Sequence, residues 1–96
     1  MPRTNIFYLD NLVSVSGEYT ANANDEVIEW TDTSPGSITL LPKDQHRSEA
    51  VSISNSTLVE LTVNPASGET IRGFDSVKFA DGTLTLYQKD GGWGIR

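Results

Sequence analysis

The one histidine of the 96-residue chain, His46, lies close to two acidic residues, Asp44 and Glu49. Imidazole and carboxylate groups bind metal ions and transfer protons near neutral pH, so this segment is the first place to look for chemistry. An Asp-x-His pair supplies only two ligands, however, and specifies neither a metal nor a geometry. We therefore expect His46 to be a solvated loop residue.

A second set of reactive groups consists of the carboxylates of Asp25, Glu26 and Glu29. Paired carboxylates serve in glycoside hydrolysis and in calcium binding. The segment NANDEVIEW does not match the Asp-x-Asp-x-Asp-Gly calcium loop, and neighbouring side chains of a strand point to opposite faces, which separates Asp25 from Glu26. Serine is abundant, but no Gly-x-Ser-x-Gly motif accompanies it. We expect no enzyme activity, no metal and no cofactor.

Aromatic residues offer a different kind of site, since sugar rings pack on aromatic faces. Tyr19, Trp30, Tyr87 and Trp93 could form such a platform, or they could pack in the core or at a subunit interface. We favour packing, and keep Tyr87 and Trp93 as candidates for a subunit interface or a glycan contact. The triplet Asn55-Ser56-Thr57 fits an N-glycosylation acceptor, but without a signal peptide a turn is the better interpretation.

Composition limits the function classes. The chain is long enough for one domain with a small core, and it has no cysteine, so oligomerisation is the favoured reinforcement. The net charge is −6, and residues 4–32 hold six carboxylates and no Lys or Arg. Nucleic acid binding requires clustered cations and is therefore not expected. No apolar run is long enough to span a membrane.

The elements that must position these groups are strands. Apolar residues alternate in GSITLLP, AVSIS, LVELTV, SVKF and TLTLYQ, which is typical of half-buried strands. Turn residues separate these runs, for example Asn64-Pro65-Ala66-Ser67-Gly68 and Asp90-Gly91-Gly92. The polar segment PKDQHRSEA suits a loop or a single helical turn. We predict an all-β domain: a small antiparallel β-sandwich or β-prism-like fold.

The N-terminal segment is different, because Ile6, Phe7, Tyr8 and Leu9 are consecutive and apolar. Residues 1–16 are either a first strand or an arm that packs on a neighbouring subunit or on another protein, and residues 17–96 form the β domain. An extended segment can add to the edge of a sheet. We select Ile6, Phe7, Tyr8 and Leu9 as the docking residues.

From Gly17 onward the chain resembles a β-rich module of tailed-bacteriophage virion proteins, namely tail fibres, tailspikes and small capsid decoration (cement) proteins. The ordered segments that carry the resemblance are EYTANANDEVIEW, GSITLLP, LVELTVNPASGETIRGFDSVKF and GTLTLYQKDGGWGIR. The resemblance transfers no catalytic residue. It implies a fold-defining set of residues, namely Ile71, Gly73, Val77, Leu84, Leu86, Gly92 and Trp93.

The resemblance also implies a structural, trimeric protein. The chain begins at its own Met1 and is short, which favours a capsid decoration protein that binds the outer shell over a long fibre. The expected partners are the major capsid protein or another virion protein and further copies of the chain in a homotrimer. The protein would be made in the bacterial cytoplasm and located on the capsid exterior or, alternatively, in the tail. The alternative function is a tail-fibre or tail-tip module that contacts host surface glycans.

Overall fold

The computed structural model describes residues 12–96, and in this range it contains ten strands and one short 3-10 helix. The elements are β1 (Leu12–Val15), β2 (Glu18–Thr20), β3 (Val27–Trp30), β4 (Gly36–Thr39), η1 (Lys43–Gln45), β5 (Ala50–Asn55), β6 (Leu61–Asn64), β7 (Thr70–Ile71), β8 (Val77–Phe79), β9 (Gly82–Lys89) and β10 (Gly92–Ile95). The all-β prediction is confirmed. The helical turn expected in the polar segment is also present, as η1.

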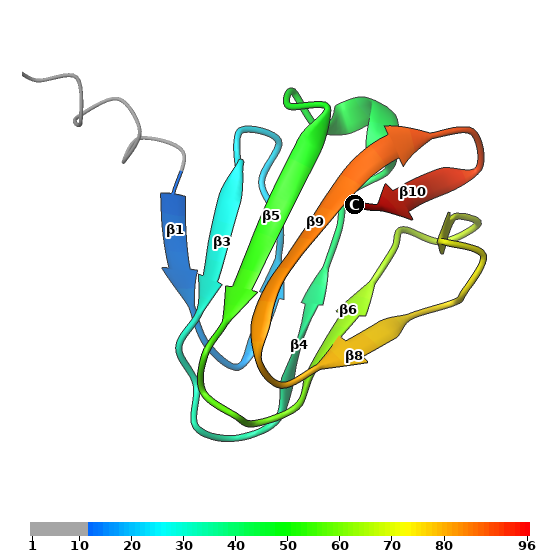
Figure 1. The fold of residues 1–96 in the computed structure, drawn as a ribbon. Helices are drawn as coiled ribbons and strands as arrows, with labels where there is room; N and C mark the ends of the chain where they lie inside the picture. Colours follow the sequence, from blue (N-terminus) through cyan, green and yellow to red (C-terminus); the bar gives the residue numbers. More distant parts are fainter. Residues whose placement is uncertain (1–11) are drawn as a thin grey trace, which may run out of the picture.

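The strands form two sheets that face each other. The larger sheet has the order β1-β3-β5-β9-β10-β7, and the smaller sheet has the order β2-β4-β6-β8 (Figure 1). From β1 to β6 the chain passes from one sheet to the other after every strand, so that β1, β3 and β5 stack in parallel, and so do β2, β4 and β6. The first 64 residues therefore include three successive coils of a solenoid-like winding.

The predicted antiparallel pairing is wrong for most of the fold. Five strand pairs are parallel and three are antiparallel. The reason is the connectivity of β1 to β6. After each full coil the chain returns to the same sheet, and the strand that it adds there runs in the same direction as the previous one. The antiparallel pairs all involve strands from the last part of the chain. Strand β8 pairs antiparallel with β6, and the long strand β9 pairs antiparallel with both β5 and β10.

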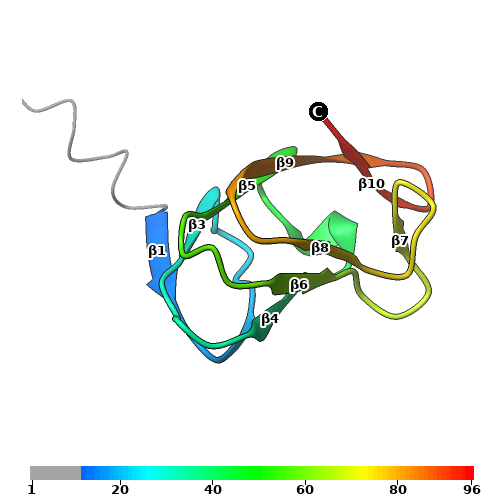
Figure 2. The same cartoon turned by 60° about the horizontal axis from the view of Figure 1, so that its bottom comes forward.

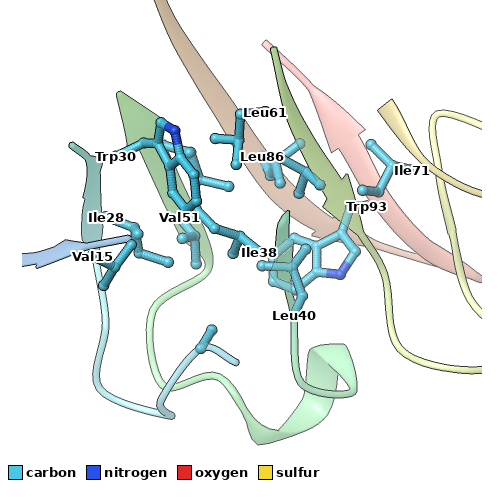
Figure 3. Packing of buried hydrophobic residues seen from close by; sticks show 13 residues of the cluster. Val15, Ile28, Trp30, Ile38, Leu40, Val51, Leu61, Ile71, Leu86 and Trp93 are labelled. Atoms are coloured by element: carbon cyan, nitrogen blue, oxygen red, sulfur yellow. The ribbon is translucent and has the colours of Figure 1, made fainter. Parts of the chain in front are cut away.

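The space between the two sheets holds a single hydrophobic core (Figure 2, Figure 3). Alternate residues of each strand enter it, as the period of two predicts. The buried apolar residues are Val15, Ala21, Ile28, Trp30, Ile38, Leu40, Val51, Ile53, Leu61, Val63, Ile71, Leu86 and Trp93. Each fully buried Leu or Ile stabilises the fold by roughly 1.5–3 kcal/mol. Both sheets contribute to this core, so neither is stable without the other.

Residues 12–15 form β1, so this part of the N-terminal segment is a first strand, one of the two alternatives stated for residues 1–16. Val15 belongs to the core cluster, and β1 is in register with β3 through the pairs Leu12–Val27 and Val15–Trp30. Residues 12–16 are therefore part of the β domain and do not form a separate arm. The proposed docking residues Ile6, Phe7, Tyr8 and Leu9 lie outside the described residues.

Candidate functional site

His46 is buried, which corrects the expectation of a solvated loop histidine. Its side chain is 5 % exposed, and Nε2 accepts a hydrogen bond of 3.0 Å from the Leu41 amide. Burial is the main cause that lowers the pKa of His46. No group of three potential metal ligands occurs within residues 12–96. His46 is therefore a neutral structural residue that holds the chain between Leu41 and the 3-10 helix.

The two tryptophans are also core residues. Trp30 and Trp93 are each 1 % exposed, and Figure 3 shows both indole rings within the apolar cluster. Trp93 consequently has no free ring face for a glycan or a neighbouring subunit, which corrects that candidate assignment. Its role is to anchor β10 against the core, next to His46.

The acidic candidates are kept apart by the fold. Asp25 is buried, and its Oδ2 accepts hydrogen bonds from the Tyr19 hydroxyl at 2.6 Å and from the Asn22 amide at 2.8 Å. Glu29 lies on the exterior, where its Oε1 accepts a bond of 2.8 Å from the Ser14 hydroxyl. Asp25 thus fixes a turn and Glu29 links two strands, and the two do not form a common site.

Asn55 is a buried structural residue in the folded domain. Its Nδ2 donates to the carbonyls of Val59 and Phe79, both at 3.0 Å. Its Oδ1 accepts from the amide of Thr57 at 3.0 Å and from the Thr57 hydroxyl at 2.7 Å. Both hydrogens of the amide are therefore used, and the sequon marks the turn that connects β5 with β6.

Within residues 12–96, one end of the fold presents the outer edges of two strands, one from each sheet. Strand β1 is the last strand of the larger sheet at this end, and β2 is the last strand of the smaller one. We use the name first-coil edge for the outer edges of β1 and β2 together with the side chains of Leu12 in β1 and Val27 in β3. Strand β1 has the sequence LVSV, without charge or proline, and Leu12 and Val27 are 39 % and 37 % exposed. Such an edge is open to pairing with another strand.

The outer strands at the opposite end have features that hinder pairing with another strand. Strand β7 is only two residues long, and β8 carries Lys78 at its centre. Short edge strands and lysines are the features by which proteins prevent unwanted strand pairing. Strand β2 is also only three residues long and carries Glu18, so β1 is the part of the first-coil edge that is best suited to contact with another protein.

A polar groove lies near the C-terminal end of the sequence, between β9 and the segment that includes η1. It has a volume of about 380 Å³ and is lined by Lys43, Glu49, Tyr87, Gln88, Lys89, Asp90 and Arg96. We call it the C-terminal groove. Of the sequence candidates, only Tyr87 contributes to it.

Tyr87 is held between its neighbours in this groove. The ring lies across Gly94, where any Cβ atom would collide with it, and the Arg96 guanidinium lies over the ring at 5.5 Å from the centroid. A sugar platform on Tyr87 would require Arg96 to move away. Sequence reasoning missed Arg96 as the neighbour of Tyr87, and its only sequence signal is a cation close to an aromatic residue.

Comparisons with known proteins find no matching family model, no matching curated protein and no matching solved structure. Over residues 12–96, no helix has the length and apolar character needed to cross a membrane.

Proposed function

We propose that this chain is a structural virion protein of a tailed bacteriophage, a decoration protein that binds the outer shell as a homotrimer and stabilises it. The observation that carries the proposal is the first-coil edge. A free strand edge without charge or proline, beside the exposed Leu12 and Val27, is suited to contact with another protein. The resemblance of the sequence to virion modules supports the same class.

Strand addition is the recognition mode that such an edge favours. The backbone N–H and C=O groups of β1 that do not face β3 can pair with an added strand, and the apolar side chains beside them add buried area. Residues 6–9 directly precede this edge in the sequence. In the proposal they are the docking segment, and the edge extends the same contact surface.

In the proposal the shell is stabilised because binding of the protein is thermodynamically linked to shell assembly. A copy that contacts two shell subunits binds the assembled shell and not the dissociated subunits, so its binding free energy adds to the stability of the shell. A homotrimer multiplies this effect, because three docking segments on one particle raise the effective concentration for each further contact. The small core of the domain also favours association with other chains.

The experiment is a shell-binding assay with a truncated chain. A protein that lacks residues 1–9 should keep its near-ultraviolet circular dichroism and its oligomeric mass and should lose binding to undecorated shells of the phage of origin. Leu12→Lys should weaken binding of the full chain at least tenfold, because it places a charge at the first-coil edge. The matched control is Leu58→Lys, since Leu58 is apolar and 74 % exposed but lies outside β1 and β3. Unchanged binding by the truncated chain would overturn the proposal.

A second candidate is a tail-fibre or tail-tip module that contacts host glycans. The observation that favours it is the C-terminal groove, which presents charged and polar groups around Tyr87. A glycan array probed with the intact protein separates the two functions, because a protein that only binds shells gives no signal on any sugar.

A further inference from the structure

We infer that the C-terminal groove binds a saccharide that carries a carboxylate, such as a uronic acid, with Arg96 as the residue that holds the carboxylate. The inference deepens the second candidate function, because it names the class of glycan and the residue that selects it. This inference does not depend on the proposed binding to the phage shell.

The first support is the distribution of charge. The whole chain has a net charge of −6, yet the groove contains three cations, Lys43, Lys89 and Arg96, against two carboxylates, Glu49 and Asp90. Lys43 is 3.4 Å from Asp44, which is the one ion pair formed among residues 12–96. Lys89 and Arg96 thus have no carboxylate within 4 Å in the part of the chain that the structure describes. These two cations are the groups in the groove that can pair with an anionic ligand.

The second support is the position of Arg96, whose guanidinium lies over the Tyr87 ring. The backbone amide of Arg96 donates a hydrogen bond of 3.0 Å to the carbonyl of Thr85. This bond places Arg96 beside β9. Its guanidinium rests on Tyr87, and that ring is in turn positioned by Gly94. The planar guanidinium fork of arginine matches the two oxygens of a carboxylate.

The third support comes from three other residues that line the C-terminal groove, namely Gln88, Glu49 and Asp90. Gln88 is immobilised, since its Nε2 donates to the carbonyls of His46 at 3.3 Å and Ser48 at 3.1 Å. Glu49 and Asp90 add carboxylate oxygens, which accept hydrogen bonds from the hydroxyl groups of a sugar. A sugar with a carboxylate can use both kinds of group, the cations for its carboxylate and Glu49 and Asp90 for its hydroxyl groups. The volume of about 380 Å³ is at the small end of the usual range of ~300–1,000 Å³, so a short saccharide fits better than a polymer.

The test is an amide-detected NMR titration of the full ¹⁵N-labelled chain. The probes are a galacturonate disaccharide, its neutral galactose counterpart, sodium acetate and inorganic phosphate. The galacturonate disaccharide should shift the amides of residues 88–91 and Arg96 and should bind roughly tenfold or more tightly than the galactose counterpart, because only it forms the charge-assisted bonds to arginine. Arg96→Gln should remove this preference, whereas Lys78→Gln, which changes an exposed cation on β8, should leave it intact.

Each other outcome contradicts the inference in a distinguishable way. Equal binding of galacturonate, acetate and phosphate would mean an unspecific anion site. Binding of the galactose counterpart alone would refute the acidic ligand but preserve the glycan-binding candidate, and a silent glycan array would refute both. Unaltered galacturonate binding by Arg96→Gln would exclude Arg96 as the anchoring residue.

Discussion

The imidazole of His46 meets the indole of Trp93 edge to face, with 5.0 Å between the ring centroids and 85° between the ring planes. His46 follows the 3-10 helix η1, and Trp93 lies in the last strand β10, so the contact joins two segments that are far apart in the sequence. Both side chains are buried. This pair closes the end of the core next to the C-terminal groove.

The first prediction concerns pH. His46 accepts the Leu41 amide proton through Nε2, so the neutral ring must carry its own proton on Nδ1. Burial lowers the pKa of His46 in the folded state. The unfolded chain therefore binds more protons as the pH falls. The contribution of His46 to the free energy of unfolding should be constant above pH ~6.5 and should decrease below it.

Urea unfolding between about pH 8 and pH 5 checks this dependence. His46→Gln should flatten the curve in that window, even if the variant is less stable at pH 8, because the titrating group is gone. An equally steep decrease in the variant would show that another group is responsible.

The second prediction concerns Asn55, which is fully buried and bonded through both amide atoms. Asn55→Ala leaves two buried carbonyls without their donors, and each such group costs about 1–3 kcal/mol. We expect a loss of about 3 kcal/mol in the free energy of unfolding, measured by urea denaturation. Asn24→Ala, at an exposed position, should change it by less than about 0.5 kcal/mol. A loss below about 1 kcal/mol for Asn55→Ala would contradict the structural role.

The third prediction concerns the backbone at Leu58, which has a φ of 66° and a side chain that is 74 % exposed. The left-handed conformation costs most residues about 1–2 kcal/mol, and asparagine tolerates it better. Leu58→Asn should therefore raise the free energy of unfolding by about 0.5–1 kcal/mol, seen as a higher thermal midpoint. Ser56→Asn, at an exposed position two residues earlier without a positive φ, should give no such gain. A lower midpoint for Leu58→Asn would be inconsistent with strain at this residue.

The fourth prediction concerns Tyr19 at high pH. Burial raises the pKa of Tyr19, and its hydrogen bond to Asp25 raises it further. The stability that the neutral hydroxyl contributes is complete below the unfolded pKa of about 10 and is lost as the pH rises through the higher folded pKa. Tyr19→Phe should cost about 1 kcal/mol at pH 7 and should weaken the loss of stability above pH ~10. Alkaline denaturation followed by circular dichroism measures both effects, and Tyr87→Phe is the control that keeps the Tyr19–Asp25 bond.

The positions of the strands could be predicted from local sequence. Alternation identified Ile38 with Leu40 and Val51 with Ile53 as same-face pairs, and all four side chains are buried. For the polar segment a loop or a single helical turn was expected, and the structure has the helical turn. These features depend on the direction of neighbouring side chains, which the backbone of a strand determines over a few residues.

The candidate site was less predictable. His46 lies in a polar segment, and only the return of β10 places Trp93 against it. Tyr87 was recognised as an aromatic candidate, but Arg96 becomes its partner through the pairing of β9 with β10. Both contacts depend on how strands pair and return, which leaves no periodic signal in the sequence.

The sequence by itself therefore determined an all-β chain, the faces of its strands and the absence of any reactive motif, because these follow from residue type and short-range alternation. Only the tertiary structure decided that the strands alternate between two sheets and pair mostly in parallel, since an alternating pattern is compatible with either direction. It also decided which edges stay open. Strand β1 becomes exposed at the end of the stack because no described strand follows it there, and nothing in the letters LVSV distinguishes an edge strand from a central one.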